Sequence, residues 1–168
     1  MVFDNIVLIG FMGSGKTSVG KTLSRELMRE FVDVDSVIEK EQNASVREIF
    51  AKSSQEHFRT LEQKCIDELC EKSGRIISTG GGLPIYSQIP QNSLIINIDA
   101  DFDIILARLS KKEREKRPLL EDEQSARALF EERQERYREI AHFNVDANQS
   151  IPTFIHIALD FILDKRIK

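Results

Sequence analysis

Short, uninterrupted apolar runs alternate along this chain with longer segments whose apolar residues recur at helical spacing. The run Asn5–Gly10 is rich in β-branched residues, carries no charge and ends in glycine, as is typical of a strand buried on both faces. Similar runs predict further strands at Phe31–Asp35, Arg75–Ser78, Leu94–Ile98 and Phe143–Val145. Parallel strands need long crossover connections, which helices usually supply. The alternation therefore predicts an α/β fold, with one parallel sheet covered by helices on both faces.

Helical patterns lie between most of the predicted strands. Two of them open with a capping-box signature, in which Ser45 is followed by Glu48 and Ser53 by Glu56. Gly74 stands where the second of these helices is expected to end. Other helices are predicted from Lys16 to residue 29, and over 101–109, 126–140 and 152–165.

The length and composition suit a single domain spanning 1–168. Of the 168 residues, 40% are hydrophobic, which is enough for one buried core. The formal net charge of −4 argues against a nucleic-acid partner. The longest uncharged stretch, Ile76–Ile98, contains glycines and prolines and is not expected to enter a membrane. Cys65 and Cys70 offer no disulfide framework, which favours a cytoplasmic location. A monomer is expected, because no strongly apolar exposed helix face stands out.

A phosphate-binding motif follows the first predicted strand. The segment Gly10–Thr17 matches the pattern GxxxxGK[ST] at every specified position, and a predicted helix comes next. Glycines let such a loop turn its N–H groups toward a phosphate, and the helix adds its positive end. Lys16 can bridge the β- and γ-phosphates, and the Thr17 hydroxyl can bind Mg²⁺. The nucleoside triphosphate site is predicted to comprise Gly13, Ser14, Gly15, Lys16, Thr17 and Ser18.

Two other interpretations of this loop are weaker. It could be a glycine-rich turn without a ligand. Alternatively, Gly13 and Gly15 fit the first two glycines of a dinucleotide-binding fingerprint. An acidic residue, Asp33 or Asp35, follows about 20 residues on, as that fingerprint requires. Its third glycine would fall at Ser18, however, and it has no use for the lysine–threonine pair.

Two further motifs are predicted at the carboxyl edge of the sheet, where ligands of open α/β folds bind. Asp33 and Asp35 stand two apart at the end of a predicted strand, so alternation would place them on the same side. One could help to hold a hydrated metal and the other could orient or deprotonate an acceptor hydroxyl. Asp35 could instead cap the following helix. Gly80–Gly82 ends the next strand, and close approach of a ligand explains three glycines better than a plain turn does.

In their order and spacing, these motifs resemble those of shikimate kinases over nearly the whole chain. The matching segments are the phosphate-binding loop, Phe31–Asp35, Phe58–Glu62, Thr79–Gly82, Arg117–Leu120, and Arg133 with Tyr137 and Ala141. The resemblance implies a P-loop kinase fold with a five-stranded parallel sheet and a mobile lid. It also implies transfer of the γ-phosphoryl group of ATP to the 3-hydroxyl of shikimate, with Mg²⁺, in aromatic amino-acid biosynthesis.

The resemblance also assigns residues to the acceptor site. By position, the shikimate-binding residues would be Asp35, Arg59, Gly80, Gly81, Gly82 and Arg133. Asp35 would act as base or positioner, and Asp33 would support Mg²⁺ through water. Arg59 and Arg133 would bind the carboxylate, because an arginine fork matches a planar carboxylate. On their own, these arginines would be interpreted as solvated helix charges. Glu62 could hold Arg59 by an ion pair on the same helix.

A basic run is the candidate lid. Lys111–Arg117 contains five basic and two acidic residues. A mobile arginine can stabilise the charge on the γ-phosphate while water is excluded. The resemblance makes Arg117 that residue, catalytic together with Lys16 and Asp35, and places the lid at about 111–122. The run alone fits a solvated loop equally well. By the same resemblance, the residues flanking the adenine would be Arg108, Ser150 and Pro152.

Two alternatives to this function stay open. A P-loop kinase acting on another anionic polyol, such as gluconate, would also use two arginines and a glycine turn. A nucleotide switch or binding module without kinase activity is a third possibility. It is disfavoured because the chain lacks the GTPase motif Asn-Lys-x-Asp and has Lys16, Asp35 and Arg117.

Overall fold

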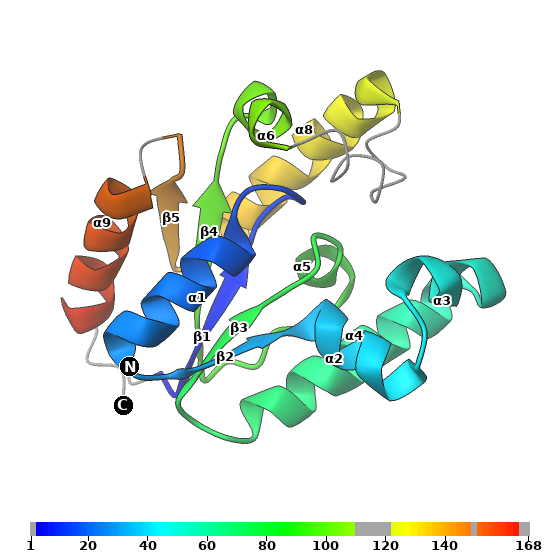
Figure 1. Cartoon of the computed structure of the whole chain (residues 1–168), viewed down its shortest axis with the longest axis horizontal. Coiled ribbons are helices and arrows are strands. Elements are labelled where there is room, and N and C mark those ends of the chain that lie inside the picture. The colour runs from blue at the N-terminus through cyan, green and yellow to red at the C-terminus, as the bar shows by residue number, and fades with distance from the viewer. Residues whose placement is uncertain (1–2, 110–121, 149–150, 165–168) are drawn as a thin grey trace.

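The computed structural model describes residues 3–109, 122–148 and 151–164 of the chain. Its centre is a sheet of five parallel strands in the spatial order β2-β3-β1-β4-β5 (Figure 1). The strands are β1 Asn5–Ile9, β2 Glu30–Asp33, β3 Arg75–Ser78, β4 Ser93–Asp99 and β5 Phe143–Asp146. The predicted α/β fold with a five-stranded parallel sheet is therefore confirmed. Because the strands are parallel, their carboxyl ends, and the motifs that follow them, lie at one edge of the sheet.

Helices pack on both faces of this sheet. Their bounds are α1 Lys16–Leu27, α2 Val34–Gln42, α3 Val46–Lys52, α4 Gln55–Cys70, α5 Leu83–Tyr86, α6 Phe102–Arg108, α8 Glu123–Ile140 and α9 Ile151–Asp164. The helix α1 contacts β2, β3 and α9, whereas α8 contacts β4 and runs behind it in the view of Figure 1. The helices α2, α3 and α4 contact one another in a separate group.

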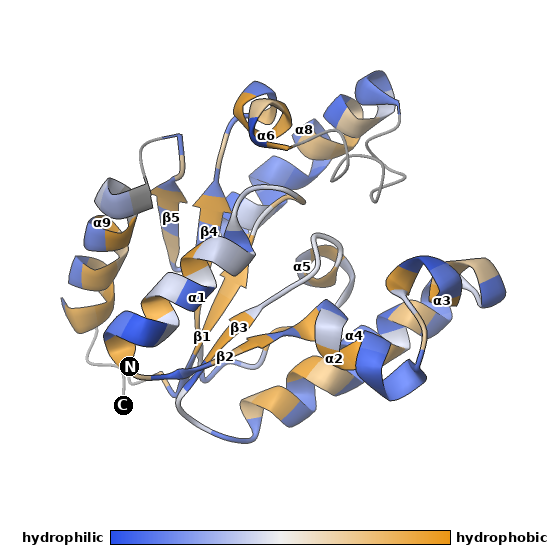
Figure 2. Cartoon of the chain, viewed as in Figure 1, coloured by the Kyte–Doolittle hydropathy of each residue, from blue (hydrophilic) through white to orange (hydrophobic). Residues whose placement is uncertain are grey.

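The apolar core lies where the strands meet these helices. Every residue of β1 is buried, as the continuous apolar run predicts. Figure 2 shows the strands mainly hydrophobic and α8 mainly hydrophilic along its length. One side of α8 is nevertheless buried, through Ala126, Phe130, Arg133 and Tyr137. The helix therefore carries both apolar and charged side chains into the interior.

Several predicted element boundaries are wrong, and at three of them a different residue makes the cap. The strand β2 ends at Asp33, not Asp35, because Asp33 caps α2 by accepting a hydrogen bond from the Ser36 backbone N–H at 3.2 Å. The N-cap of α4 is Ser54 instead of Ser53. That helix ends at Cys70, so Gly74 lies in the following loop and not at the cap. The capping box of Ser45 with Glu48, in contrast, is confirmed.

Two further expectations can be compared with the structure. Cys65 and Cys70 are both buried and free, in agreement with the absence of a disulfide framework. Among the residues that the structure describes, no helix combines the length and apolar character needed to cross a membrane.

The contact between α1 and the sheet depends on Gly20. A Cβ atom at this position would lie 2.3 Å from Cε2 of Phe31 and 3.1 Å from Cδ1 of Leu8. The helix therefore approaches the sheet more closely than any side chain at this position would allow. This close approach sets the distance of α1 from the sheet, and therefore also the distance of the loop that precedes the helix.

We expect Gly20→Ala to lower the free energy of unfolding by about 1 kcal/mol, because the overpacking cost exceeds the gain in helix propensity. Chemical denaturation measures the change, with Lys21→Ala on the exposed side of α1 as the control. In a Phe31→Leu background the same substitution should become neutral or stabilising, because the obstructing ring is gone. An equal loss in both backgrounds would contradict the packing argument.

Candidate active site

The phosphate-binding loop joins β1 to α1 at the carboxyl edge of the sheet. Lys16 is buried, and its Nζ donates hydrogen bonds of 2.8 Å to the carbonyl oxygens of Gly10 and Phe11. The lysine thus folds back along the start of its own loop. Thr17 and Ser18 are exposed on the first turn of α1. An ammonium group and two hydroxyls therefore meet at a helix N-terminus, which is an arrangement suited to phosphate.

Two loop glycines adopt left-handed conformations for different purposes. A Cβ atom on Gly13, where φ is 80°, would lie 2.9 Å from Leu109 and 3.0 Å from Ile105, so the α6 segment packs directly on the loop. A Cβ atom on Gly15, where φ is 105°, would meet no atom within 4 Å, so the backbone angle alone requires glycine there. Between them, the hydroxyl of Ser14 is buried without a hydrogen-bond partner in the described part of the chain. A ligand oxygen or N–H group would relieve that cost.

The two aspartates that follow β2 do not lie side by side on a strand. Asp33 ends β2 and caps α2, whereas Asp35 lies in the first turn of α2. The expected strand alternation is wrong here, because the chain turns into a helix at Val34. The helical turn carries the Asp35 carboxylate toward β3, where its Oδ1 lies 2.8 Å from the position that a Cβ atom on Gly80 would occupy. The capping role considered for Asp35 belongs to Asp33.

Asp35 is a strongly perturbed acid. Burial raises the pKa of its carboxyl to about 7, and the negative charges of Asp33 and Glu62 add to the rise. The positive charge of Lys16 opposes it. A carboxyl group with a pKa near neutrality can accept a proton and release it at physiological pH.

The three-glycine turn lies between charged side chains. A Cβ atom on Gly80 would lie 3.2 Å from Oε1 of Glu62, and one on Gly82 would lie 2.5 Å from Nη1 of Arg59. The carbonyl of Gly81 accepts a 2.6 Å hydrogen bond from the Tyr137 hydroxyl. Close approach explains Gly80 and Gly82, but the groups that approach are side chains of this chain and not the ligand that the sequence analysis predicted. A Cβ atom on Gly81 would make only ordinary contacts, the nearest at 3.5 Å.

The turn is bordered by two arginines, of which Arg59 is half-buried and Arg133 is buried. Arg59 forms the expected ion pair with Glu62, whose side chain is only 1% exposed. Burial raises the pKa of Glu62, and the positive charges of Arg59 and Arg133 counteract that rise. Arg133 is 6% exposed, so it is not the solvated helix charge that its local sequence suggests. The structure therefore brings Asp35, Arg59, Gly80, Gly81, Gly82 and Arg133 together.

Tyr86, the last residue of α5, is a member of this cluster that sequence analysis missed. The centroid of its ring lies 4.5 Å from Cζ of Arg59 and 5.8 Å from Cζ of Arg133. Its only sequence signal is an aromatic residue four positions beyond the glycine turn. Tyr137 was part of the motif without a role, and the structure gives it one as the donor to Gly81.

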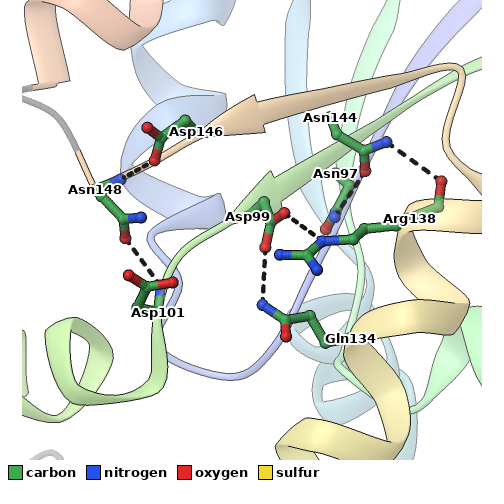
Figure 3. Close-up of polar contacts among 8 residues, drawn as sticks. All are labelled: Asn97, Asp99, Asp101, Gln134, Arg138, Asn144, Asp146 and Asn148. Atoms are coloured by element: carbon green, nitrogen blue, oxygen red, sulfur yellow. Dashed lines mark hydrogen bonds and ion pairs between the residues drawn. The ribbon is translucent and has the colours of Figure 1, made fainter.

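The helix α8 is also held on the face next to the one that meets the glycine turn, by a second set of contacts (Figure 3). Gln134 donates to Oδ1 of Asp99 at 3.2 Å, and Nε of Arg138 donates to Oδ2 at 2.7 Å. Asp99 ends β4, so the sheet fixes the helix that carries Arg133 and Tyr137. The helix is thereby anchored at two adjoining faces, one at Asp99 and one at the Gly81 carbonyl.

The residues predicted to flank adenine are only partly described. Arg108 donates a 2.6 Å hydrogen bond to the carbonyl of Ala147, and the backbone N–H of Asp101 donates to Oδ1 of Asn148 at 2.9 Å (Figure 3). These bonds tie α6 to the loop after β5. Pro152 is exposed in the first turn of α9. Ser150, Arg117 and residues 111–121 of the candidate lid lie outside the described residues.

We expect Asp35→Asn to stabilise the fold at pH 8. The unfolded carboxyl ionises near 3.8 and the folded one near 7, so the folded state loses stability as the pH rises between these values. The variant avoids that loss, which amounts to about 1–4 kcal/mol. Denaturation at pH 5 and pH 8 measures it, with Asp67→Asn on the exposed side of α4 as the control. A gain that did not grow with pH would contradict the raised pKa.

Comparison with known proteins identifies the family. The sequence model described as shikimate kinase matches residues 12–163. The chain is 38% identical to a shikimate kinase from Helicobacter hepaticus, over 88% of this chain and 89% of that protein. It is 36% identical to one from a Sulfurihydrogenibium species, over 90% and 92%. A shikimate kinase from Acinetobacter baumannii, solved in complex with shikimate, superposes with a TM-score of 0.87 at 34% identity, covering 99% of this chain and 96% of that one. Because the family model matches most of the chain and these relatives are 36–38% identical over most of their length, the chain belongs to the shikimate kinase family.

Proposed function

We propose that this chain transfers the γ-phosphoryl group of ATP to the 3-hydroxyl of shikimate, as a step of aromatic amino-acid biosynthesis. The observation that carries the proposal is the arrangement around Gly80–Gly82. The half-buried guanidinium group of Arg59 lies beside Gly82, the buried Arg133 lies near it, and a carboxyl group with a pKa of about 7 lies beside Gly80. A hydroxylated monocarboxylic acid can engage the arginines through its carboxylate while a ring hydroxyl faces Asp35.

In this proposal the loop binds the triphosphate. Gly13, Gly15 and Ser18 contribute backbone N–H groups at the start of α1, and the Ser14 hydroxyl gains a partner. Lys16 bridges the β- and γ-phosphates and stabilises the charge that develops between them. The oxygen of the acceptor hydroxyl bonds to the γ-phosphorus while Asp35 accepts the hydroxyl proton. The bond between the γ-phosphorus and the oxygen that bridges to the β-phosphate breaks, and ADP leaves.

Thr17 and Asp33 are the residues that would hold Mg²⁺, the first through its hydroxyl and the second through water. Both are hard oxygen donors, the type of ligand that Mg²⁺ prefers. Thr17 is exposed on the first turn of α1, and Asp33 ends β2 at the same edge of the sheet. When bound, the ion neutralises charge on the β- and γ-phosphates.

The remaining assignments belong to the same proposal. Arg117, on a lid at about 111–122, stabilises the γ-phosphate and excludes water. Arg108, Ser150 and Pro152 flank adenine, which the tie between Arg108 and the loop after β5 supports. The two free, buried cysteines are consistent with a cytoplasmic location. A monomeric state and the absence of nucleic-acid or membrane partners stay predictions.

A coupled assay of ADP release tests the function. MgATP is supplied with shikimate, with gluconate or with no acceptor, and Lys16→Met serves as the control for contaminating activity. Release that requires shikimate and is lost in Lys16→Met is the expected result. ADP release with gluconate but not with shikimate would support kinase activity and would contradict shikimate as the acceptor. Release without any acceptor, or none under any condition, would favour a binding module.

Arg133→Ala is expected to raise KM for shikimate by about 10- to 100-fold, the range for losing a charge-assisted hydrogen bond. The KM for ATP should change less than threefold, because the loop is unaltered. Arg136→Ala is the matched control, since Arg136 lies on the same helix, is 56% exposed and pairs with Glu139. Equal losses for both substrates in Arg133→Ala would show that Arg133 supports the fold and not the acceptor.

A further inference from the structure

Tyr86 occupies an unusual place for a large aromatic residue. It ends the short helix α5, which begins directly after the glycine turn, and its side chain is 48% exposed. Arg59 lies near three rings, and the distances from its Cζ to the centroids are 4.5 Å for Tyr86, 5.6 Å for Phe58 and 6.0 Å for Phe50. Tyr86 is thus the nearest of the three, and its ring is also 5.8 Å from Arg133.

The two arginines need something to hold them in place. They carry like charges in a buried region, and each has a buried Nε without a hydrogen-bond partner among the described residues. Glu62 pairs with a terminal nitrogen of Arg59, and Arg133 interacts with Tyr137 and Glu62. Such polar contacts are made at the edge of a guanidinium group, whereas an aromatic ring contacts its face. The electron-rich face of an aromatic ring attracts guanidinium groups and restricts their tilt. One ring in reach of both arginines can therefore set their relative orientation.

We propose that Tyr86 is a positioning and specificity-determining residue, whose ring aligns Arg59 and Arg133 to receive the carboxylate of the acceptor. This inference rests on the proposed function and adds to it a determinant of acceptor charge. The ring acts through the guanidinium groups, so its contribution exists only for an acceptor that carries the carboxylate. The ring contacts neither the loop nor the reacting oxygen in this account, so kcat and KM for ATP are independent of it.

The test compares two acceptors, shikimate and its uncharged methyl ester, in four forms of the enzyme. The forms are wild type, Tyr86→Ala, Tyr86→Phe and, as a matched control, Phe161→Ala. Phe161 is a ring that stacks on Phe143 at 3.9 Å, away from the acceptor site, so its removal reports on a general loss of aromatic packing. Melting temperatures are recorded for all four forms.

Tyr86→Ala is expected to raise KM for shikimate about tenfold, the size of a partly desolvated cation–π contact. Its kcat and its KM for ATP should change less than twofold. With the methyl ester, kcat/KM should change less than twofold, and this ratio is measurable well below saturation. Tyr86→Phe, which keeps the ring, should restore KM for shikimate to within threefold of wild type.

The opposite pattern would overturn the proposal. An equal loss with shikimate and with the ester would mean that the ring packs on the acceptor itself or supports the fold. The same KM changes in Phe161→Ala would indicate general destabilisation. Wild-type turnover of shikimate is measured first and tests the proposed function by itself, so an inactive wild type would overturn both ideas. An active wild type with an unaffected Tyr86→Ala variant would overturn only the role of Tyr86.

Discussion

The candidate acceptor site depends on the ion pair between the buried carboxylate of Glu62 and Arg59. A charge so far removed from water is costly unless it is paired, and Arg59 provides the pair. The same carboxylate attracts Arg133 from α8. While Asp35 is protonated, below its pKa of about 7, the two guanidinium groups and the Glu62 carboxylate leave one positive charge in the cluster. A ligand with a single carboxylate balances it, which is why the geometry favours a monocarboxylic acceptor over a neutral polyol.

The fold serves this cluster by bringing distant segments to one edge of the sheet. Asp35 comes from α2, Arg59 and Glu62 from α4, and Arg133 from α8. The glycine turn after β3 lies between them, and Asp35 and Arg59 approach Gly80 and Gly82 more closely than a Cβ atom at either position would allow. The ties between α8 and Asp99 shown in Figure 3 hold the last of these helices against β4. Rigid elements thus determine the separation between the arginines and the Asp35 carboxyl.

Much of the fold could be predicted from the sequence, because the patterns that specify strands, loops and helix caps are local. A continuous apolar run and a capping box each specify their own structure, and both were confirmed. The helix expected to follow the glycine-rich loop also begins at Lys16, as predicted. The end of β2 was missed, because Asp33 and Asp35 fit a strand as well as a cap, and the choice depends on packing of α2 against α4. The alignment of Arg59 and Arg133 with Tyr86 could not be read from spacing at all. It arises from contacts between elements, and the local sequence of each arginine is that of a solvated helix.

The most direct test of this account is a crystal structure of the protein with shikimate and ADP bound. We predict the shikimate carboxylate within hydrogen-bond distance of both Arg59 and Arg133, with the 3-hydroxyl directed at Asp35. A carboxylate bound elsewhere, or a ring turned so that another hydroxyl faces Asp35, would contradict it.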